Sequence, residues 1–183
     1  MMPIAPLMIE HRLIERMISL IQREGQRLAS HPDGDLALVD TAVDFIRTYA
    51  DRCHHGKEEG ILFRDLREKN LSAEHAGVLQ ELIDEHNWAR NKVLGLISAK
   101  TRFADGDREA AREVASIMRE LAEFYPKHIE KEDKRFFIPV MDYFSEEEKA
   151  TMLAEEFEFD RGLIHEKYRQ TVETLEKAKL KNT

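Results

Sequence analysis

The chain has 183 residues, of which 35% are charged and 42% are hydrophobic, and this length suits one domain with a single core. With only 8 Gly and 5 Pro, an all-β fold of many short strands is disfavoured. The net charge of −8 argues against nucleic acid and anionic membranes as partners, and the single cysteine excludes an intrachain disulfide framework. The 8 histidines are the unusual feature of this composition.

Apolar residues recur at alternating three- and four-residue steps over five segments, a pattern typical of amphipathic helices. Turn clusters separate the segments, such as His31-Pro32-Asp33-Gly34-Asp35. Ser72 is placed to cap the third segment, and Ser145 with Glu148 has the pattern of a capping box at the start of the fifth. The predicted helices cover about residues 7–28, 39–70, 73–97, 114–139 and 145–177.

Short links between long helices make neighbouring helices antiparallel. We therefore predict an all-α fold: an antiparallel up-down-up-down four-helix bundle over about residues 7–140, with an additional C-terminal helix over about 145–177. The sequence has no internal repeat, so residues 1–183 are expected to form a single domain. It also lacks an uninterrupted run of 18 apolar residues and a signal-peptide pattern, so no membrane association and a cytoplasmic location are expected.

Three histidines interrupt the inward apolar stripes, and His54 lies at the edge of another. Two of the four are followed four residues later by a glutamate on the same side of the helix. Reflecting each position through the predicted turns brings the four histidines to within roughly 6 Å of one level, at 1.5 Å per residue. A single inward histidine is more often an ordinary core residue. Four at one level, with buried glutamates that are rare unless paired or bound to a metal, favour a metal site. These residues are His11, His54, His86 and His128, with Glu58 and Glu132.

Four short motifs that contain these residues resemble the hemerythrin-like, or HHE cation-binding, domain family over about residues 7–140. They are Glu10-His11, His54-His55-Gly56-Lys57-Glu58, Glu85-His86 and His128-Ile129-Glu130-Lys131-Glu132. The resemblance implies a helical bundle that carries a non-haem di-iron centre. It also implies that His11, His54, His86 and His128 are terminal ligands and that Glu58 and Glu132 bridge the two ions.

The third helix departs from the pattern of the oxygen-carrying members, which place a second histidine four residues after the first. Here Arg90 follows His86 at that spacing, so one ligand is either missing or comes from elsewhere. His165 on the fifth helix is the candidate, and a core histidine is the equally supported alternative. On the fourth helix, Asp133 could replace Glu132, because the oxygen carriers use a histidine and an aspartate five residues apart.

The second helix offers two overlapping pairs, His54 with Glu58 and His55 with Glu59. The first pair is preferred because the residues that precede it on the same helical face are small and apolar, whereas charged residues precede the second. The second pair stays open as a replacement for the first.

Imidazole and carboxylate donors without thiolate suit iron or manganese, with zinc possible. We therefore expect a non-haem di-iron protein that binds or senses a small ligand, such as oxygen or nitric oxide, or iron itself. The alternative is a di-iron enzyme that reduces peroxide or nitric oxide or supports iron-cluster repair, and the second alternative is a structural helical module that binds zinc or no metal. A binding protein is favoured over an enzyme because the sequence has no substrate-binding motif. Tyr49 and Tyr125 are candidates to donate a hydrogen bond to a bound ligand, although both also fit core packing. The sequence leaves the oligomeric state open.

Overall fold

The computed structural model describes residues 1–31, 36–161 and 164–180. Its regular elements are all helical over these residues, which confirms the predicted all-α class. Three segments are π-helical, with hydrogen bonds that run from residue i to residue i+5. The elements are α1 (Ile4–Ser30), α2 (Ala37–Phe45), π-helical η1 (Ile46–His55) and η2 (Glu58–Leu62), α3 (Phe63–Leu66), α4 (Ala73–Ala104), α5 (Ala110–Lys131), π-helical η3 (Glu132–Phe136), α6 (Phe137–Val140), the 3-10 turn η4 (Met141–Tyr143), α7 (Glu146–Phe159) and α8 (Ile164–Leu180).

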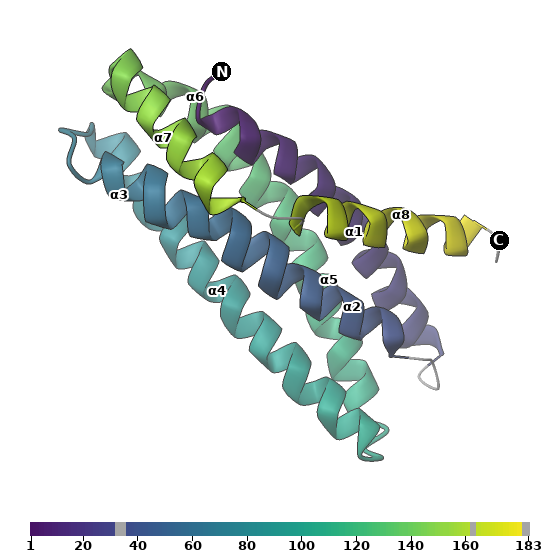
Figure 1. The fold of residues 1–183 in the computed structure, drawn as a ribbon. Helices are drawn as coiled ribbons and strands as arrows, with labels where there is room; N and C mark the ends of the chain where they lie inside the picture. Colours follow the sequence, from purple (N-terminus) through teal and green to yellow (C-terminus); the bar gives the residue numbers. More distant parts are fainter. Residues whose placement is uncertain (32–35, 162–163, 181–183) are drawn as a thin grey trace.

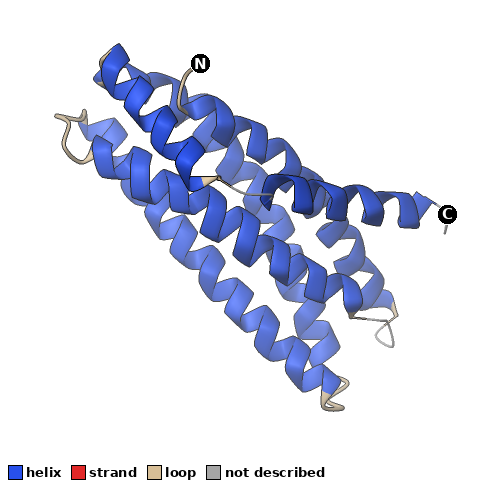
Figure 2. Ribbon diagram, viewed as in Figure 1, coloured by secondary structure: helices blue, strands red, loops and turns tan. Residues whose placement is uncertain are grey.

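The long helices lie side by side. Helix α1 packs along α5, α5 packs along α4, and the run from α2 through η1 lies against α4 (Figure 1). Helix α7 packs against η2, while α8 crosses α1 and η1 (Figures 1 and 2). Within the described part of the chain, no helix has both the length and the apolar character that crossing a bilayer requires.

The predicted helix starts at Ser72 and Ser145 are confirmed. The Ser72 hydroxyl accepts the backbone N–H of His75, and Ser145 with Glu148 forms a complete capping box. The fifth helix, however, is two helices, because α7 ends at Phe159 and α8 begins at Ile164. The sequence places a glycine at position 162, which disfavours a continuous helix, although residues 162–163 themselves lie outside the described part.

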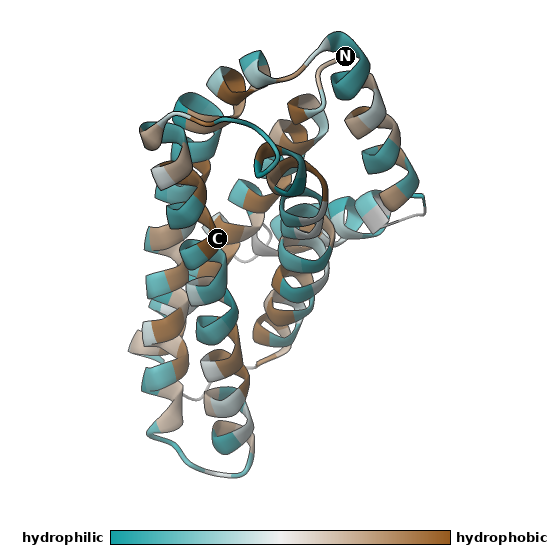
Figure 3. Ribbon diagram, turned by 90° about the vertical axis from the view of Figure 1, so that its left-hand side faces the viewer, coloured by the Kyte–Doolittle hydropathy of each residue, from teal (hydrophilic) through white to brown (hydrophobic). Residues whose placement is uncertain are grey.

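The core has two apolar clusters with a polar layer between them. Leu7 and Leu82 belong to one cluster, while Ile14 and Val93 belong to the other. His11 lies between Leu7 and Ile14 on α1 and is fully buried. Figure 3 shows hydrophobic and hydrophilic residues alternating along each helix, as amphipathic helices require. Burying polar groups in such a layer is costly unless they are paired or bind a ligand, so the layer is where function is expected.

Candidate metal centre

Two groups of buried side chains meet in the polar layer. In each group, one ligand atom per residue lies within 4.8 Å of the corresponding atoms of the other members. All the members are almost completely shielded from solvent. The first group, called here the two-histidine group, is His11, His54, Glu58 and Glu132; the second, the three-histidine group, is His55, His86 and His128.

Glu58 on η2 lies between the two groups. Its Oε1 is 3.3 Å from Nε2 of His54, and its Oε2 is 3.3 Å from Nε2 of His86. The two oxygens of one carboxylate are therefore turned toward histidines of different groups. This is the arrangement that a carboxylate needs to bridge two ions.

The two carboxylate oxygens of Glu132 on η3 also face histidines of different groups. Its Oε2 is 3.2 Å from Nε2 of His11, and its Oε1 is 3.3 Å from Nε2 of His128. The Oε1 atom is also 3.7 Å from Nε2 of His86. Two carboxylates from different elements thus join the same pair of histidine groups.

The atoms that face the centre lack hydrogen-bond partners among the described residues. They are Nε2 of His11, His54, His86 and His128, and both carboxylate oxygens of Glu58 and Glu132. A buried polar atom without a hydrogen bond costs about 1–3 kcal/mol, and in this layer only ion pairs of 3.2–3.3 Å among the same side chains offset that cost. A bound cation would satisfy them together, and this mixed set of nitrogen and oxygen donors suits iron, manganese or zinc.

Every histidine of the two groups has a carboxylate near its other ring nitrogen, Nδ1. A carboxylate at Nδ1 fixes the tautomer and the ring orientation, so that Nε2 presents its lone pair to the centre. The Nδ1 to carboxylate distances are His11 to Asp133 2.7 Å, His54 to Glu10 2.8 Å, His86 to Glu59 2.7 Å, His128 to Glu85 2.7 Å and His55 to Asp51 3.4 Å.

Four of these outer carboxylates adjoin an inner residue in the sequence. Adjacent residues are rotated by about 100° on an α-helix and by less on the π-helical η2 and η3, so the neighbour of an inward ligand is turned toward an adjacent helix. An acidic residue beside four of the inner residues can therefore hold a histidine that comes from another element. The adjoining pairs are Glu10 with His11, Glu58 with Glu59, Glu85 with His86 and Glu132 with Asp133.

His54 and His55 both belong to the centre, one in each group, so the structure does not choose between them. They end η1, where π-helical hydrogen bonds make the turn wider and reduce the rotation between successive residues. Glu59, the partner proposed for His55, instead holds Nδ1 of His86. Asp133 likewise lies in the outer ring and not at the centre.

His165 lies outside both groups. Its Nε2 is 2.9 Å from Oδ2 of Asp160, and its Nδ1 is 3.0 Å from the Tyr49 hydroxyl. The third histidine of the three-histidine group is His55 instead. Arg90, at the position of the absent third-helix histidine, pairs with Asp51 and is not part of the centre either.

His165 belongs to a third group, which lies behind His54 and also contains Glu10, Cys53 and Asp160. The positive charge among these carboxylates comes from the protein itself: the ammonium of the fully buried Lys57 contacts both Glu10 and Asp160. Cys53 is also buried and donates to Asp160 at 3.2 Å, and burial raises the pKa of its thiol. Lys57 offsets one of the two carboxylate charges, and this network orients His54 through Glu10.

The histidines differ in charge state in the metal-free chain. Burial opposes the charged form of His54 and His86, but neighbouring carboxylates outweigh it and raise the pKa of His54 to about 10 and that of His86 to about 9. Burial and the neighbouring imidazoles lower the pKa of His55 well below its ordinary value. Because a ligating imidazole must be deprotonated, metal binding at neutral pH would release protons from this centre.

Comparison with known families agrees with this geometry. The hemerythrin HHE cation binding domain matches residues 2–138. The chain therefore belongs to the hemerythrin HHE cation-binding domain family, and the resemblance read from the short motifs is confirmed. A search of solved structures found no match.

Proposed function

We propose that the chain is a non-haem di-iron protein that binds a small ligand such as oxygen or nitric oxide. The observation that carries the proposal is the division of Glu58 and Glu132 between the two histidine groups, with the facing atoms unpartnered among the described residues. One ion would be held by His11 and His54, the other by the three-histidine group, and both by the shared carboxylates.

Donor counting supports ligand binding. The two-histidine group supplies two imidazoles and one oxygen from each glutamate, which makes four donors; the three-histidine group supplies five in the same way. Six-coordinate ions would retain positions for an outside ligand. Bound iron would contribute redox-active, Lewis-acidic ions, while the chain holds the imidazole tautomers through its outer carboxylates and excludes bulk water with its two apolar clusters.

Metal analysis tests the proposal. We expect about two iron ions per chain in protein purified without added metal, and nitric oxide or oxygen binding in proportion to iron. Less than half an equivalent of iron, after aerobic and anaerobic purification alike, would contradict it.

Two further readouts separate the alternatives. Catalytic turnover of peroxide or nitric oxide, lost in His54→Ala, would indicate the enzyme. Zinc in place of iron, without ligand binding, would indicate a structural module.

A further inference from the structure

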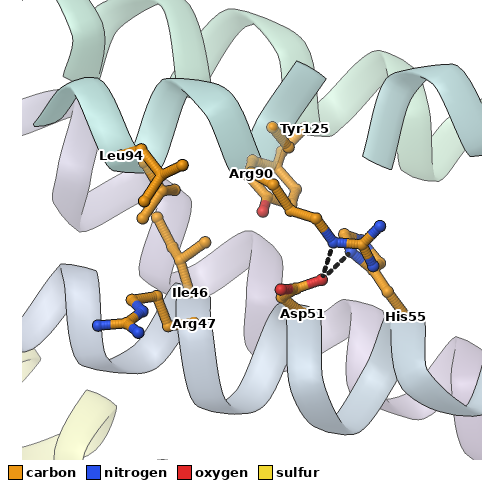
Figure 4. A pocket seen from close by; sticks show the side chains of 9 residues that line it. Ile46, Arg47, Asp51, His55, Arg90, Leu94 and Tyr125 are labelled. Carbon is orange, nitrogen blue, oxygen red and sulfur yellow. Dashed lines mark hydrogen bonds and ion pairs between the residues drawn. The ribbon is translucent and has the colours of Figure 1, made fainter. Parts of the chain in front are cut away.

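A pocket of about 140 Å³ lies beside the three-histidine group, between η1, α4 and α5 (Figure 4). Its wall is mainly apolar, and an apolar cavity of roughly this size is enough to hold benzene or xenon. It therefore has room for a ligand of a few heavy atoms next to the ring of His55. Its lining includes Arg47, Asp51, His55, Arg90, Leu94 and Tyr125.

Tyr125 supplies an unused donor to this pocket. Its hydroxyl is buried and has no hydrogen-bond partner among the described residues, and it points into the pocket (Figure 4). The Tyr125 ring also meets the ring of His128 edge-on, with centroids 6.5 Å apart. An unpartnered buried hydroxyl costs about 1–3 kcal/mol, and phenylalanine would fill the same apolar space without that cost. A ligand atom that accepts a hydrogen bond explains why the hydroxyl is placed there.

An ion-pair network forms one side of the pocket. Arg90 Nε donates to Asp51 at 2.8 Å, and Arg90 Nη2 donates to Glu59 at 2.8 Å. Both carboxylates also hold histidines of the centre: Asp51 is near Nδ1 of His55, and Glu59 is near Nδ1 of His86. Arg47 also lines the pocket, so two guanidiniums balance the carboxylates of Asp51 and Glu59 and the polar side has no net formal charge. Together with the mainly apolar wall, this balance favours a neutral ligand.

We propose that this pocket is the entry chamber through which a small neutral ligand with an acceptor atom, of the size of oxygen or nitric oxide, reaches the metal pair. Tyr125 donates a hydrogen bond to the ligand in the chamber. Arg90, with Asp51 and Glu59, forms the polar side of the chamber. The same two carboxylates contact His55 and His86. The inference rests on the proposed function, because the chamber adjoins the proposed metal pair through His55, which lines it.

Xenon binding tests the chamber in the full chain without any metal. Leu94 is 61% exposed and lines the pocket, so Leu94→Trp should block it without disturbing the core. The control is Ser98→Trp, an exposed position one turn further along α4 and outside the pocket lining. We expect xenon beside Tyr125 in crystals of the unaltered chain and of the control, and none in Leu94→Trp. No xenon in the unaltered chain would overturn the inference.

Nitric oxide binding to the iron-loaded chain tests the role of Tyr125. Tyr125→Phe should weaken nitric oxide binding by about 2- to 10-fold, the worth of one hydrogen bond, while leaving the melting temperature unchanged or higher. Tyr143→Phe is the matched control, since its hydroxyl contacts Ser72 and His75, which belong to neither histidine group. Leu94→Trp should slow nitric oxide association at least about tenfold, and Ser98→Trp should not.

The outcomes separate the two proposals. Iron-loaded chains with the same affinity in Tyr125→Phe and the same association rate in Leu94→Trp would overturn the chamber and leave the di-iron proposal intact. A Tyr125→Phe chain that binds nitric oxide more weakly only because it is less stable would also overturn the ligand role. A chain that takes up xenon but binds no iron would overturn the proposed function and the chamber together.

Discussion

Glu10 on α1 accepts a hydrogen bond from Nδ1 of His54 on η1 at 2.8 Å. Both side chains are buried, and Nε2 of the same imidazole faces the centre. The residue next to Glu10 in the sequence, His11, is itself a member of the two-histidine group. Of these two consecutive residues, His11 therefore belongs to the centre, and Glu10 holds His54 from outside it. The same arrangement, an inner residue next to an outer carboxylate, recurs around the centre. The outer carboxylates can therefore be tested by mutation.

Glu85→Gln should weaken metal binding. Glu85 Oε2 is 2.7 Å from Nδ1 of His128, and losing the charge there reduces the hold on the ring orientation and the basicity of the ligand. Substitutions of such outer partners typically cost about 10- to 100-fold in metal affinity, which a competition titration against a chelator would measure. Glu81→Gln is the matched control because Glu81 shares Lys131 with Glu85 but not the histidine. An equal loss in both variants would count against an outer role for Glu85.

His55→Ala and His165→Ala should behave differently. Removing His55 deletes a member of the three-histidine group, so the chain should retain about one ion in place of two. His165→Ala should retain both, because His165 contacts Asp160 and Tyr49 instead. Elemental analysis of the two purified variants measures the number of bound ions. Two ions in His55→Ala and one in His165→Ala would show that His165, and not His55, completes the three-histidine group.

Metal removal should destabilise the chain. A ligand that binds only the folded state raises its stability by about 2.7 kcal/mol when the free concentration is 100 times Kd. Calorimetry with and without added ferrous iron should therefore show a rise in melting temperature. In the double variant Glu58→Gln/Glu132→Gln, which lacks both shared carboxylates, the rise should disappear. A full rise in that variant would contradict the bridging role.

Glu156→Gln should stabilise the chain more as the pH rises. Glu156 on α7 is buried with one unpartnered oxygen, and burial raises its pKa to about 8. The folded chain thus holds the proton more tightly than the unfolded chain, whose glutamates ionise near pH 4.5, and stability is lost as the pH climbs from there toward 8. Glutamine avoids that loss.

Denaturant unfolding at pH 5 and at pH 8.5 would measure this effect. We expect the gain of Glu156→Gln over the unaltered chain to grow by at least about 1.4 kcal/mol, the worth of one pKa unit. The exposed Glu158 on the same helix provides the control substitution, Glu158→Gln. A gain that is equal at both pH values would show that ionisation of Glu156 is not its source.

The helices and six inward residues could be predicted because both follow from periodicity. The stripe that contains Leu7, His11 and Ile14 defines one face of a helix, and reflection through the turns brings the histidines to one level. His55 was set against His54 as an alternative because α-helical geometry points neighbours in different directions. The π-helical turn of η1 removes that conflict, and its hydrogen bonding has no clear signature in the sequence.

The outer ring was missed because its members resemble ordinary surface acids. Glu10, Glu59 and Glu85 are three among many carboxylates in a charged chain, and their role depends on which helix lies beside them. A usable signal was nevertheless present, since each adjoins an inward ligand. The expectation for His165 relied on one continuous fifth helix, and the break after Phe159 changes the level at which that histidine lies.

The central claim is that Glu58 and Glu132 hold two ions between the two histidine groups. Anomalous diffraction at the iron edge, from crystals of the iron-loaded chain, tests it most directly. The account predicts two peaks in the polar layer, one beside His11 and His54 and the other beside His55, His86 and His128, with both glutamates in contact with both peaks. A single peak, or a peak among Glu10, Asp160 and His165 in place of these, would contradict it.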